Sequence, residues 1–411
     1  MSQPKVAVIG GGAAGLFAAI FASYSGGDVT LYEQNPFCGK KLNITGKGRC
    51  NLTNLCDLDT FLQNVPANPR FLYKALTEFS PEDTMAFVEG LGVPLKVERG
   101  RRVFPVSDKA RDVTDALVRA AKESGVRIVK AKAESLLAEN GEITGLTLLK
   151  DGRRETVRLQ KVILATGGAS YPLTGSTGDG YRMAQALGHT MTPVTPSLVP
   201  LVSPDSFCKS CMGLSLRNVG ISFHRGDKCL YKEQGEMLFA HFGVTGPVIL
   251  SASAHLRGSY PLEMRIDMKP ALDEKTLSDR LLREFASASN KDLRNCMNSL
   301  LPAGMIQPFL DKQKIDGAQK IHSVTKETRN ALVKALKCIS IPITGTRPTQ
   351  EAIVTGGGIK VTEVNPRTME SKLVRGLFFA GEVLDVDAYT GGYNLQIAFS
   401  TGRLAGVSAA E

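Results

Sequence analysis

A glycine-rich turn near the N-terminus constrains the fold of this chain more than any other segment. The sequence reads Gly10-Gly11-Gly12-Ala13-Ala14-Gly15, which fits the pattern G-x-G-x-x-G. A short apolar run, 6–9, comes directly before it, and an apolar segment that reads as helix, 16–22, follows. A continuous apolar run of this length is typical of a strand buried on both faces of a parallel sheet. The order of strand, glycine turn and helix predicts the start of an α/β fold.

The three glycines of the pattern have different expected roles in binding a dinucleotide. Gly10 permits the tight turn, Gly12 lets a pyrophosphate approach the backbone, and Gly15 lets the helix pack against the strand. The N-terminus of the helix supplies unpaired N–H groups and a partial positive charge. A second strand, 29–32, leads to Glu33, whose carboxylate can accept both ribose hydroxyls. Together these features predict a Rossmann-like dinucleotide-binding domain.

A polar, glycine-dense loop, 34–54, decides between the two common dinucleotides. A simple NAD-binding domain would continue with another helix, whereas this loop can follow an extended cofactor. It resembles the segment that runs along the flavin in FAD-binding proteins of the glutathione-reductase type. We expect Lys40 or Lys41 near the phosphates. Gly46 and Gly48 would let the backbone approach the cofactor, and an ordinary surface loop is the alternative interpretation.

Two later segments support FAD. The strand 161–164 ends in Ala165-Thr166-Gly167-Gly168, which such flavoproteins carry where the chain returns beside the first strand. Near the C-terminus, another apolar strand leads into a glycine turn at Gly381, followed by Glu382 and Asp385. An acid at this position can accept a ribityl hydroxyl.

A second glycine turn, Gly391-Gly392, opens the last helix, which extends to about residue 405. The N-terminus of that helix can face N1 and the C2 carbonyl of the isoalloxazine, where negative charge collects on reduction. No second strand–G-x-G-x-x-G–helix pattern is present, so a separate NAD(P) domain is not expected.

We therefore expect FAD as the cofactor, bound by residues from all of these segments. The expected contacts are Gly10, Gly12, Ala13, Ala14, Gly15, Glu33, Lys40, Lys41, Gly46, Gly48, Arg49, Cys50, Asn51, Ala133, Ala165, Thr166, Gly167, Gly381, Glu382, Asp385, Gly392, Tyr393, Asn394 and Leu395.

Net charge gives less information than the motifs. Lys and Arg total 50 and Asp and Glu total 40, so the formal net charge is +10. Such an excess could attract nucleic acid, an anionic membrane or a phosphorylated cofactor. It is spread over the whole chain, and the short patch Arg99-Gly100-Arg101-Arg102 is interpreted as solvated surface. We expect a small-molecule substrate, with nucleic acid and membranes disfavoured as partners.

Cysteine usage favours a reducing compartment. The eight cysteines have irregular spacings, which suits the cytosol better than a disulfide framework. Cys208 and Cys211 form a lone C-x-x-C without a second pair, so no metal site is expected. Cys50 and Cys56 do not have the C-x4-C spacing of disulfide reductases. With no signal peptide or membrane span expected, the sequence favours a cytoplasmic protein whose oligomeric state stays open, a monomer included.

The middle of the chain shows two different spacings of apolar residues. Alternating apolar residues, such as Val219, Ile221 and Phe223, predict an antiparallel sheet or small barrel. From about 271 the apolar residues recur at helical spacing, as at Leu277 and Leu281. The sequence thus predicts three domains. These are an FAD-binding domain at 1–192 and 356–411, a β-barrel substrate domain at 193–270 and 338–355, and a helical domain at 271–337.

Six motifs resemble those of a bacterial flavoprotein family that includes aminoacetone oxidase and the flavoprotein reductase of bile-acid dehydroxylation. Its members are often labelled NAD(P)/FAD-dependent oxidoreductases. Ala240 stands where Thr is expected in many members. The resemblance implies a discontinuous glutathione-reductase-type FAD domain carrying a β-barrel and a nested helical bundle. The matching motifs are 10–15, 45–54, 165–168, 238–247, 367–371 and 381–394.

Three residues are candidates for the chemistry itself. His241 can donate a proton or anchor the substrate, and the alternative is a histidine that fixes a loop by hydrogen bonds. Tyr389, like Tyr393, flanks the glycine pair and can cap the ring or donate a proton, with packing as the alternative. Arg102 can hold a carboxylate, with an ordinary ion pair as the alternative.

These observations predict an FAD-dependent oxidoreductase that transfers hydride between flavin N5 and a small organic substrate. NAD(P)H is the expected transient co-substrate and electron donor, and a conjugated C=C, as in an enone, is the expected group to be reduced. Within the same family, the alternative is an oxidase of small amines that uses O2. Two alternatives of another class are an RNA-modifying flavoprotein and a flavin-binding protein without turnover.

Overall fold

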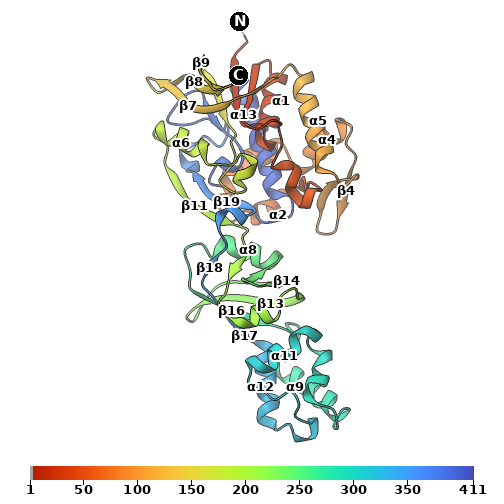
Figure 1. The fold of residues 1–411 in the computed structure, drawn as a ribbon. Helices are drawn as coiled ribbons and strands as arrows, with labels where there is room; N and C mark the ends of the chain where they lie inside the picture. Colours follow the sequence, from red (N-terminus) through yellow and green to blue (C-terminus); the bar gives the residue numbers. More distant parts are fainter. Residues whose placement is uncertain (1–2) are drawn as a thin grey trace. The chain divides into compact units, whose positions relative to one another are not determined.

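The computed structural model describes residues 3–411 (Figure 1), and these form two compact units. The first contains the chain up to Ser197 together with Thr349–Glu411, and the second is Leu198–Pro348. The first unit is therefore discontinuous in sequence, because the whole second unit is inserted between two of its strands.

A five-stranded parallel sheet forms the centre of the first unit. Its order is β20-β10-β1-β2-β6, and each neighbouring pair is parallel. The apolar run before the glycine turn is the middle strand and is buried from Val6 to Ile9, as the sequence predicted. The strands are β1 (Lys5–Ile9), β2 (Asp28–Glu33), β6 (Arg127–Lys130), β10 (Lys161–Leu164) and β20 (Leu377–Phe379).

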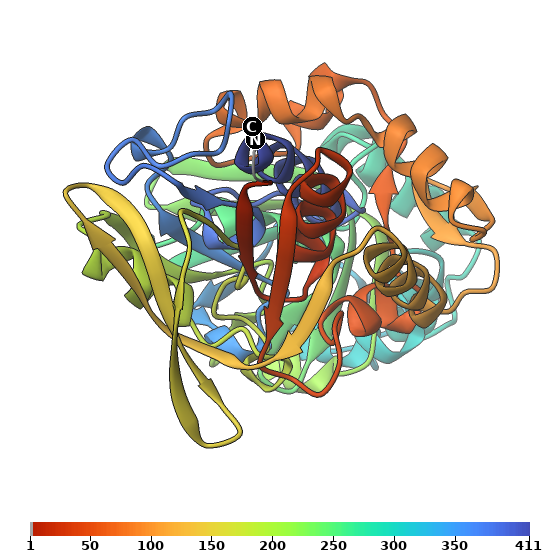
Figure 2. The same cartoon turned by 90° about the horizontal axis from the view of Figure 1, so that it is seen from above.

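Two helices, α1 (Ala13–Tyr24) and α13 (Tyr393–Ala410), pack closely against each other beside this sheet (Figures 1 and 2). Small residues permit the approach. A Cβ placed on Gly402 would overlap the carbonyl oxygen of Ala14, and one placed on Gly406 would overlap that of Ala18. This packing brings the N-terminal glycine turn and the last helix of the chain together.

Smaller elements complete the first unit. A three-stranded antiparallel meander, yellow in Figure 2, consists of β7 (Lys132–Glu139), β8 (Glu142–Lys150) and β9 (Arg153–Arg158). A second small sheet has the order β3-β5-β4, with β3 (Thr53–Asn54), β4 (Leu95–Glu98) and β5 (Arg102–Pro105), and a third pairs β11 (Met191–Ser197) with β19 (Val354–Ile359). The remaining helices are α2 (Leu58–Gln63), α3 (Tyr73–Glu78), α4 (Pro81–Gly90), α5 (Ala110–Glu123) and α6 (Asp179–Ala186).

The second unit contains a seven-stranded antiparallel sheet of order β17-β16-β13-β14-β15-β12-β18. One residue separates β17 from β18 in the chain, yet these strands lie at opposite ends of the sheet. The sheet must therefore curve until its ends meet, which gives a barrel. The strands are β12 (Leu201–Val202), β13 (Ser215–Arg225), β14 (Lys228–Ala240), β15 (Gly243–Thr245), β16 (Leu262–Asp267), β17 (Ile339–Ile343) and β18 (Gly345–Thr346), with helices α7 (Ser206–Ser210) and α8 (Pro247–His255).

Four helices lie between β16 and β17 in sequence. They are α9 (Glu274–Ala286), α10 (Leu293–Cys296), α11 (Ala303–Lys312) and α12 (Lys326–Lys337). Leu277 and Leu281 of α9 are buried in the same hydrophobic cluster as Ile221 and Phe223 of the barrel. The fold class is confirmed, while the division into three domains stays a prediction, because barrel and helices share one core. Within residues 3–411, no helix combines the length and apolarity needed to cross a membrane.

Candidate cofactor site

The glycine turn after β1 has the geometry that its sequence predicted. Gly10 has a φ of +102°, in the left-handed region that favours glycine, and its N–H donates to the Tyr32 carbonyl at 2.9 Å. A Cβ on Gly15 would overlap the Gly10 carbonyl oxygen, so only glycine lets α1 start this close to the strand. A Cβ on Gly12, by contrast, would meet no protein atom within 4 Å. The turn is thus tightly packed at Gly10 and Gly15, whereas the space next to Gly12 is open.

The N-terminus of α1 fits a phosphate group. Gly12 is the N-cap residue, so no side chain caps the helix, and its first turn contains no acidic residue. The first N–H groups of a helix have no partner within it and carry partial positive charge. Open space above Gly12 together with these donors suits the pyrophosphate of a dinucleotide.

Glu33 lies at the end of β2 beside this turn. Its Oε2 accepts from the Gly11 N–H at 2.6 Å, and its Oε1 accepts from the backbone N–H and the Nδ2 of Asn35, both at 2.7 Å. The side chain is buried, with 8% exposed. These bonds fix the carboxylate next to the open space over the turn, and its predicted contact with the ribose stays a prediction.

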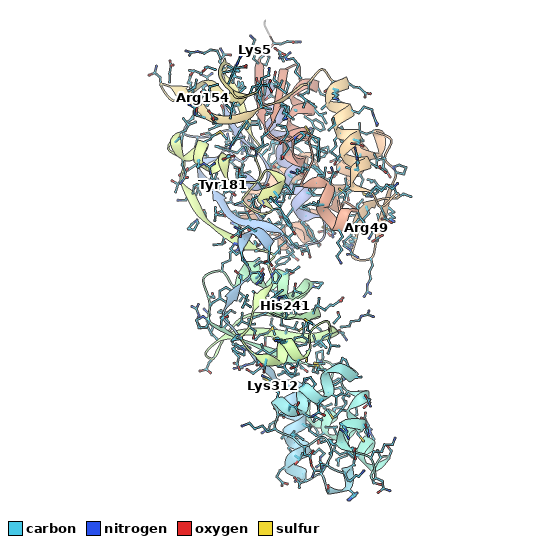
Figure 3. All side chains as sticks on the ribbon, viewed as in Figure 1. Lys5, Arg49, Arg154, Tyr181, His241 and Lys312 are labelled. Carbon is cyan, nitrogen blue, oxygen red and sulfur yellow. The ribbon has the colours of Figure 1, made fainter. Side chains whose placement is uncertain are left out.

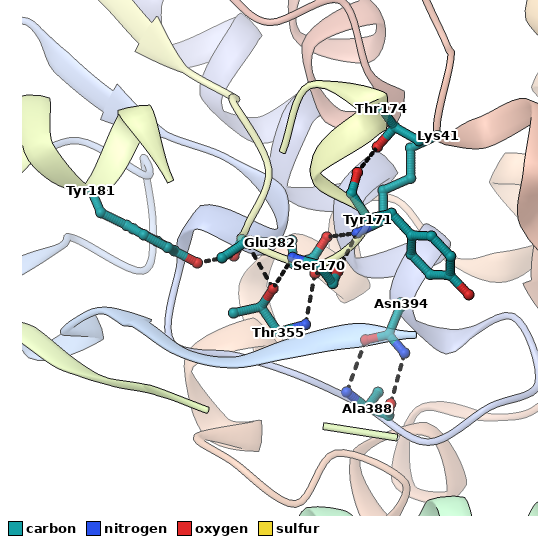
Figure 4. Close-up of polar contacts among 10 residues, drawn as sticks. Lys41, Ser170, Tyr171, Thr174, Tyr181, Thr355, Glu382, Ala388 and Asn394 are labelled. Carbon is teal, nitrogen blue, oxygen red and sulfur yellow. Dashed lines mark hydrogen bonds and ion pairs between the residues drawn. The ribbon is translucent and has the colours of Figure 1, made fainter. Parts of the chain in front are cut away.

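Glu382, just after β20, is the centre of a polar cluster (Figure 4). Lys41 donates to its Oε2 at 2.6 Å and to the Oγ of Ser170 at 2.7 Å. The Thr355 N–H donates to its Oε1 at 2.8 Å and the Ser170 hydroxyl to the same oxygen at 3.0 Å. Burial raises the pKa of Glu382, but the ammonium of Lys41 and these hydrogen bonds outweigh it, so the pKa lies below its ordinary value. Lys41 is therefore paired with the carboxylate, whereas the sequence suggested phosphates for Lys40 or Lys41.

Asp385 is held a few residues further on. The Thr192 hydroxyl donates to its Oδ2 at 2.7 Å, and the Asn68 amide donates to the same oxygen at 3.2 Å. Gly381 has a φ of +74° and donates its N–H to the Thr401 hydroxyl of α13 at 3.0 Å. This segment thus connects β20 to the last helix.

The loop after β2 contains a short 3-10 segment, Leu42–Gly48, that is interrupted at Gly46, whose φ is +56°. Arg49 forms ion pairs with Glu98 and Asp108 and lies 4.2 Å from the centre of the Phe104 ring, so it belongs to a surface charge network (Figure 3). Gly48 has a φ of +84°, and Lys40 is half-buried.

The end of the loop is tied to the start of α13. Cys50 is fully buried, and burial raises its pKa to about 12. The Asn51 amide, oriented to satisfy both neighbours, donates to the Thr53 carbonyl at 3.3 Å and accepts from the Gly392 N–H at 3.1 Å. Gly392 has a φ of +104°, and a Cβ there would overlap the backbone of Thr53. Glycine is required at this contact.

The N-terminus of α13 is arranged like that of α1. Gly392 is its N-cap, so no side chain caps it, and no acid lies in its first turn. Asn394 accepts from the Ala388 N–H at 2.9 Å and donates to the Ala388 carbonyl at 2.7 Å (Figure 4). Its side chain therefore fixes the preceding loop. Leu395 is half-buried against the core of the first unit.

Four further predicted contacts belong to the first unit. Ala133 in β7 and Ala165 after β10 are buried, and Gly167 has a φ of +74°. The buried hydroxyl of Thr166 has no hydrogen-bond partner within residues 3–411, and neither has that of Thr53. Because a buried polar atom without a partner is costly, both hydroxyls fit a site that holds a polar ligand.

The residues predicted to take part in the chemistry differ in burial. Tyr393 is buried edge-on to Phe61, with ring centres 5.0 Å apart, and burial raises its pKa to about 12. Tyr389 is half-buried, and its backbone N–H donates to the Asn64 carbonyl at 3.0 Å. Arg102 is exposed and donates to the Arg99 carbonyl at 3.0 Å.

His241 lies in the other unit, in the turn between β14 and β15 (Figure 3). It is exposed, and its ring centre lies 5.0 Å from that of Phe242. The catalytic roles assigned to His241, Tyr389 and Arg102 stay predictions.

Sequence reasoning missed the residues that hold the acids in place. No sequence motif identifies the residues that bind these carboxylates, which are Ser170, Thr355 and Thr192. Asn54 belongs to a motif that was recognised, yet its role depends on contacts with distant segments. Its amide donates to the Gly391 carbonyl at 3.1 Å.

The thiols of the cysteine pair in the second unit are expected to be unreactive. Cys208 and Cys211 are buried, and burial raises their pKa values to about 11 and about 12 respectively. Buried thiols of this kind hold their protons at neutral pH and make poor nucleophiles or metal ligands. In the described part of the chain, no group of three or more His, Cys, Asp or Glu side chains could hold a metal ion.

Comparison with known proteins covers nearly the whole chain. A family model described as HI0933-like protein Rossmann domain matches residues 4–408. The 3-dehydro-bile acid delta(4,6)-reductase of Clostridium scindens is 32% identical over 99% of this chain and 99% of its own length. A ribosomal RNA dihydrouridine synthase of Escherichia coli K12 is 30% identical over 98% of this chain and 96% of its own length.

Among solved structures, the 3-ketosteroid-delta4-(5alpha)-dehydrogenase of Rhodococcus jostii RHA1 in complex with 4-androstene-3,17-dione has a TM-score of 0.55. It is 18% identical and covers 100% of this chain and 98% of its own, so it shows a shared fold. Together, the matches confirm the resemblance drawn from the motifs and the expected class, an FAD-dependent oxidoreductase.

Proposed function

The chain belongs to the HI0933-like protein family, and we propose that it reduces a carbon–carbon double bond conjugated to a carbonyl group. The observation that carries this proposal is the full-length similarity to two relatives. The names of both relatives describe the reduction of a conjugated carbon–carbon double bond. The delta(4,6) double bonds of a 3-dehydro-bile acid are conjugated to its C3 carbonyl. The C5–C6 double bond of uridine, which is saturated in dihydrouridine, is conjugated to the C4 carbonyl.

Both reductions add a hydride at a carbon β or δ to the carbonyl, where the conjugated system is electron-poor, and a proton at the other carbon of the same double bond. FAD, when bound, supplies hydride chemistry at N5, with NAD(P)H as the expected donor. The chain's own residues would hold the cofactor. The open space at Gly12 would admit the pyrophosphate, and Glu33, fixed beside Gly11, would accept the ribose hydroxyls. The N-terminus of α13, which no side chain caps, would stabilise negative charge on the flavin ring. Tyr389, which precedes the Gly391-Gly392 turn, is the residue to test as proton donor.

RNA is the second candidate substrate. The relative named as a ribosomal RNA dihydrouridine synthase and the net charge of +10 favour it. A polyanionic substrate would be attracted to such a chain, and its binding would weaken steeply with salt. The amine-oxidase alternative stays a prediction.

Anaerobic mixing of the purified yellow protein with NADH or NADPH, followed by a substrate, tests the proposal. Bleaching of the flavin by a nicotinamide and its reoxidation by a 3-keto-delta(4,6) steroid or by unmodified ribosomal RNA would support it. Bleaching by aminoacetone alone would support the oxidase instead. A colourless protein that takes up no FAD would overturn the cofactor assignment. Tyr389→Phe should slow reoxidation by substrate while the nicotinamide still bleaches the flavin, and unchanged reoxidation would remove Tyr389 from the proposal.

A further inference from the structure

An arginine-rich hairpin tip lies in the first unit. The loop 99–101 joins β4 to β5, and its flanking residues Glu98 and Arg102 are the last pair of the ladder. Gly100 and Arg101 both have left-handed φ values, +77° and +59°, which make the tight reversal. Arg99, Arg101 and Arg102 are exposed on this tip.

The body of the same hairpin has its charges balanced. Arg49 pairs with Glu98 and Asp108, and Lys96 lies 2.8 Å from the same aspartate and 3.6 Å from the same glutamate. The two carboxylates therefore neutralise these two cations.

The tip is different. Arg101 lies 3.9 Å from Asp57, and both side chains are more than half exposed. Within residues 3–411, no carboxylate lies at ion-pair distance from Arg99 or Arg102. Exposed charges of the same sign repel one another, so three arginines beside a single carboxylate suit an anionic partner.

The tip is fastened to the start of α13. The Leu55 N–H donates to the Arg101 carbonyl at 2.8 Å. The amide of Asn54 donates to the Gly100 carbonyl at 3.0 Å and to the Gly391 carbonyl at 3.1 Å. One side chain thus connects the arginine tip to the glycine turn where the reactive end of the cofactor is expected.

We propose that Arg99, Arg101 and Arg102 form an anchor for the phosphodiester backbone of a single-stranded RNA substrate, beside the turn that opens α13. The inference rests on the proposed function, because the anchored strand would offer its uracil ring as the conjugated double bond. The three arginines are exposed at the tip of a hairpin. That arrangement fits successive phosphates of an extended polyanion better than a single small anion.

The test uses the full-length protein and a fluorescein-labelled oligouridylate, with binding followed by fluorescence anisotropy over a salt series. The variant is Arg99→Gln/Arg101→Gln. The matched control is Arg153→Gln/Arg154→Gln on β9, which removes the same charge from exposed positions of the same unit. Each pair of arginines includes one near a carboxylate: Arg101 lies 3.9 Å from Asp57, and Arg154 lies 2.7 Å from Glu134.

Loss of two phosphate contacts should reduce the slope of log K against log salt by about 1.4, since each contact on a single strand contributes about 0.7. The control should keep the wild-type slope, and FAD content and melting temperature confirm folding of both variants. Equal slopes for the hairpin variant and wild type would overturn the anchor. So would a wild type that binds anionic phospholipid vesicles but not oligouridylate.

The two proposals fail separately. Oligouridylate binding is measured without turnover, so it still reports on the anchor if no double bond is reduced. Conversely, reduction of a free uncharged enone by the hairpin variant at the wild-type rate, with RNA binding lost, would support both proposals. Reduction of oligouridylate at an unchanged KM would overturn the anchor alone.

Discussion

Lys41 and Glu382, 341 residues apart in the chain, form an ion pair with nitrogen and oxygen 2.6 Å apart. Their side chains are only 24% and 19% exposed, so the pair is largely shielded from water. We expect Lys41→Met to lower the free energy of unfolding by about 2 kcal/mol, between the values typical of surface and buried pairs. Lys74→Met, which breaks a more exposed pair with Glu78, should cost less than about 0.5 kcal/mol. Urea unfolding measures both.

The same pair predicts a pH dependence. The pKa of Glu382 in the folded chain lies below its ordinary value of 4.5, so the unfolded chain takes up its proton first. The stability that the pair contributes is present above that value and is lost as the pH falls through the lowered pKa. The difference between wild type and Lys41→Met should therefore shrink in acid. A difference that is constant across this range would show that the ion pair is not its cause.

Gly12 and Gly15 provide a matched pair of substitutions. Gly15→Ala should destabilise the protein by about 3 kcal/mol or prevent folding, because its Cβ would overlap the Gly10 carbonyl. Gly12→Ala should lower the melting temperature of the FAD-free protein much less than Gly15→Ala, since the new methyl meets no protein atom within 4 Å and only the N-cap preference for Gly over Ala is lost. It should weaken FAD binding, because it fills the space over the turn. Titration of the apoprotein with FAD would contradict the pyrophosphate assignment if Gly12→Ala bound as tightly as wild type.

Glu33→Gln tests the ribose contact. A hydrogen bond to a charged group contributes about 1.5–3 kcal/mol, so FAD affinity should fall by about 10- to 100-fold. Asp28→Asn, at the other end of β2, removes a charge that is paired with Arg127 at the surface and should leave the affinity unchanged. Fluorescence titration with FAD measures both variants, and equal affinities for the two would refute the role of Glu33.

The cysteines should differ in reactivity. Cys229 and Cys338 are exposed, whereas Cys208 and Cys211 are buried with pKa values of about 11 and about 12. We expect iodoacetamide to label the exposed pair first in the native protein, and the buried pair only after denaturation. Peptide mass spectrometry reads the order. Rapid native labelling of Cys208 or Cys211 would contradict the protection of these thiols by burial.

Local pattern was enough to predict the parts of the fold that depend on near neighbours. The spacing of Gly10, Gly12 and Gly15 predicted a tight turn, an open position and a close helix contact, and the structure has all three. Alternating apolar residues predicted the barrel strands, because side chains of a strand face opposite sides in turn. In β16 the buried residues are Leu262, Met264 and Ile266, as alternation requires.

The sequence by itself therefore determined the dinucleotide turn, the α/β class and the inserted barrel, since each follows from residues close together in the chain. Only the tertiary structure decided that Lys41 meets Glu382, and that Asn54 joins the arginine tip to Gly391. Lys41 meets Glu382 because the parallel sheet places β20 beside β10 and β10 beside β1, next to β2, and so brings distant segments to one edge. Asn54 reaches the arginine tip because β3 pairs with β5 in a separate sheet. No local periodicity records such an arrangement, because it depends on which strands pair across hundreds of residues.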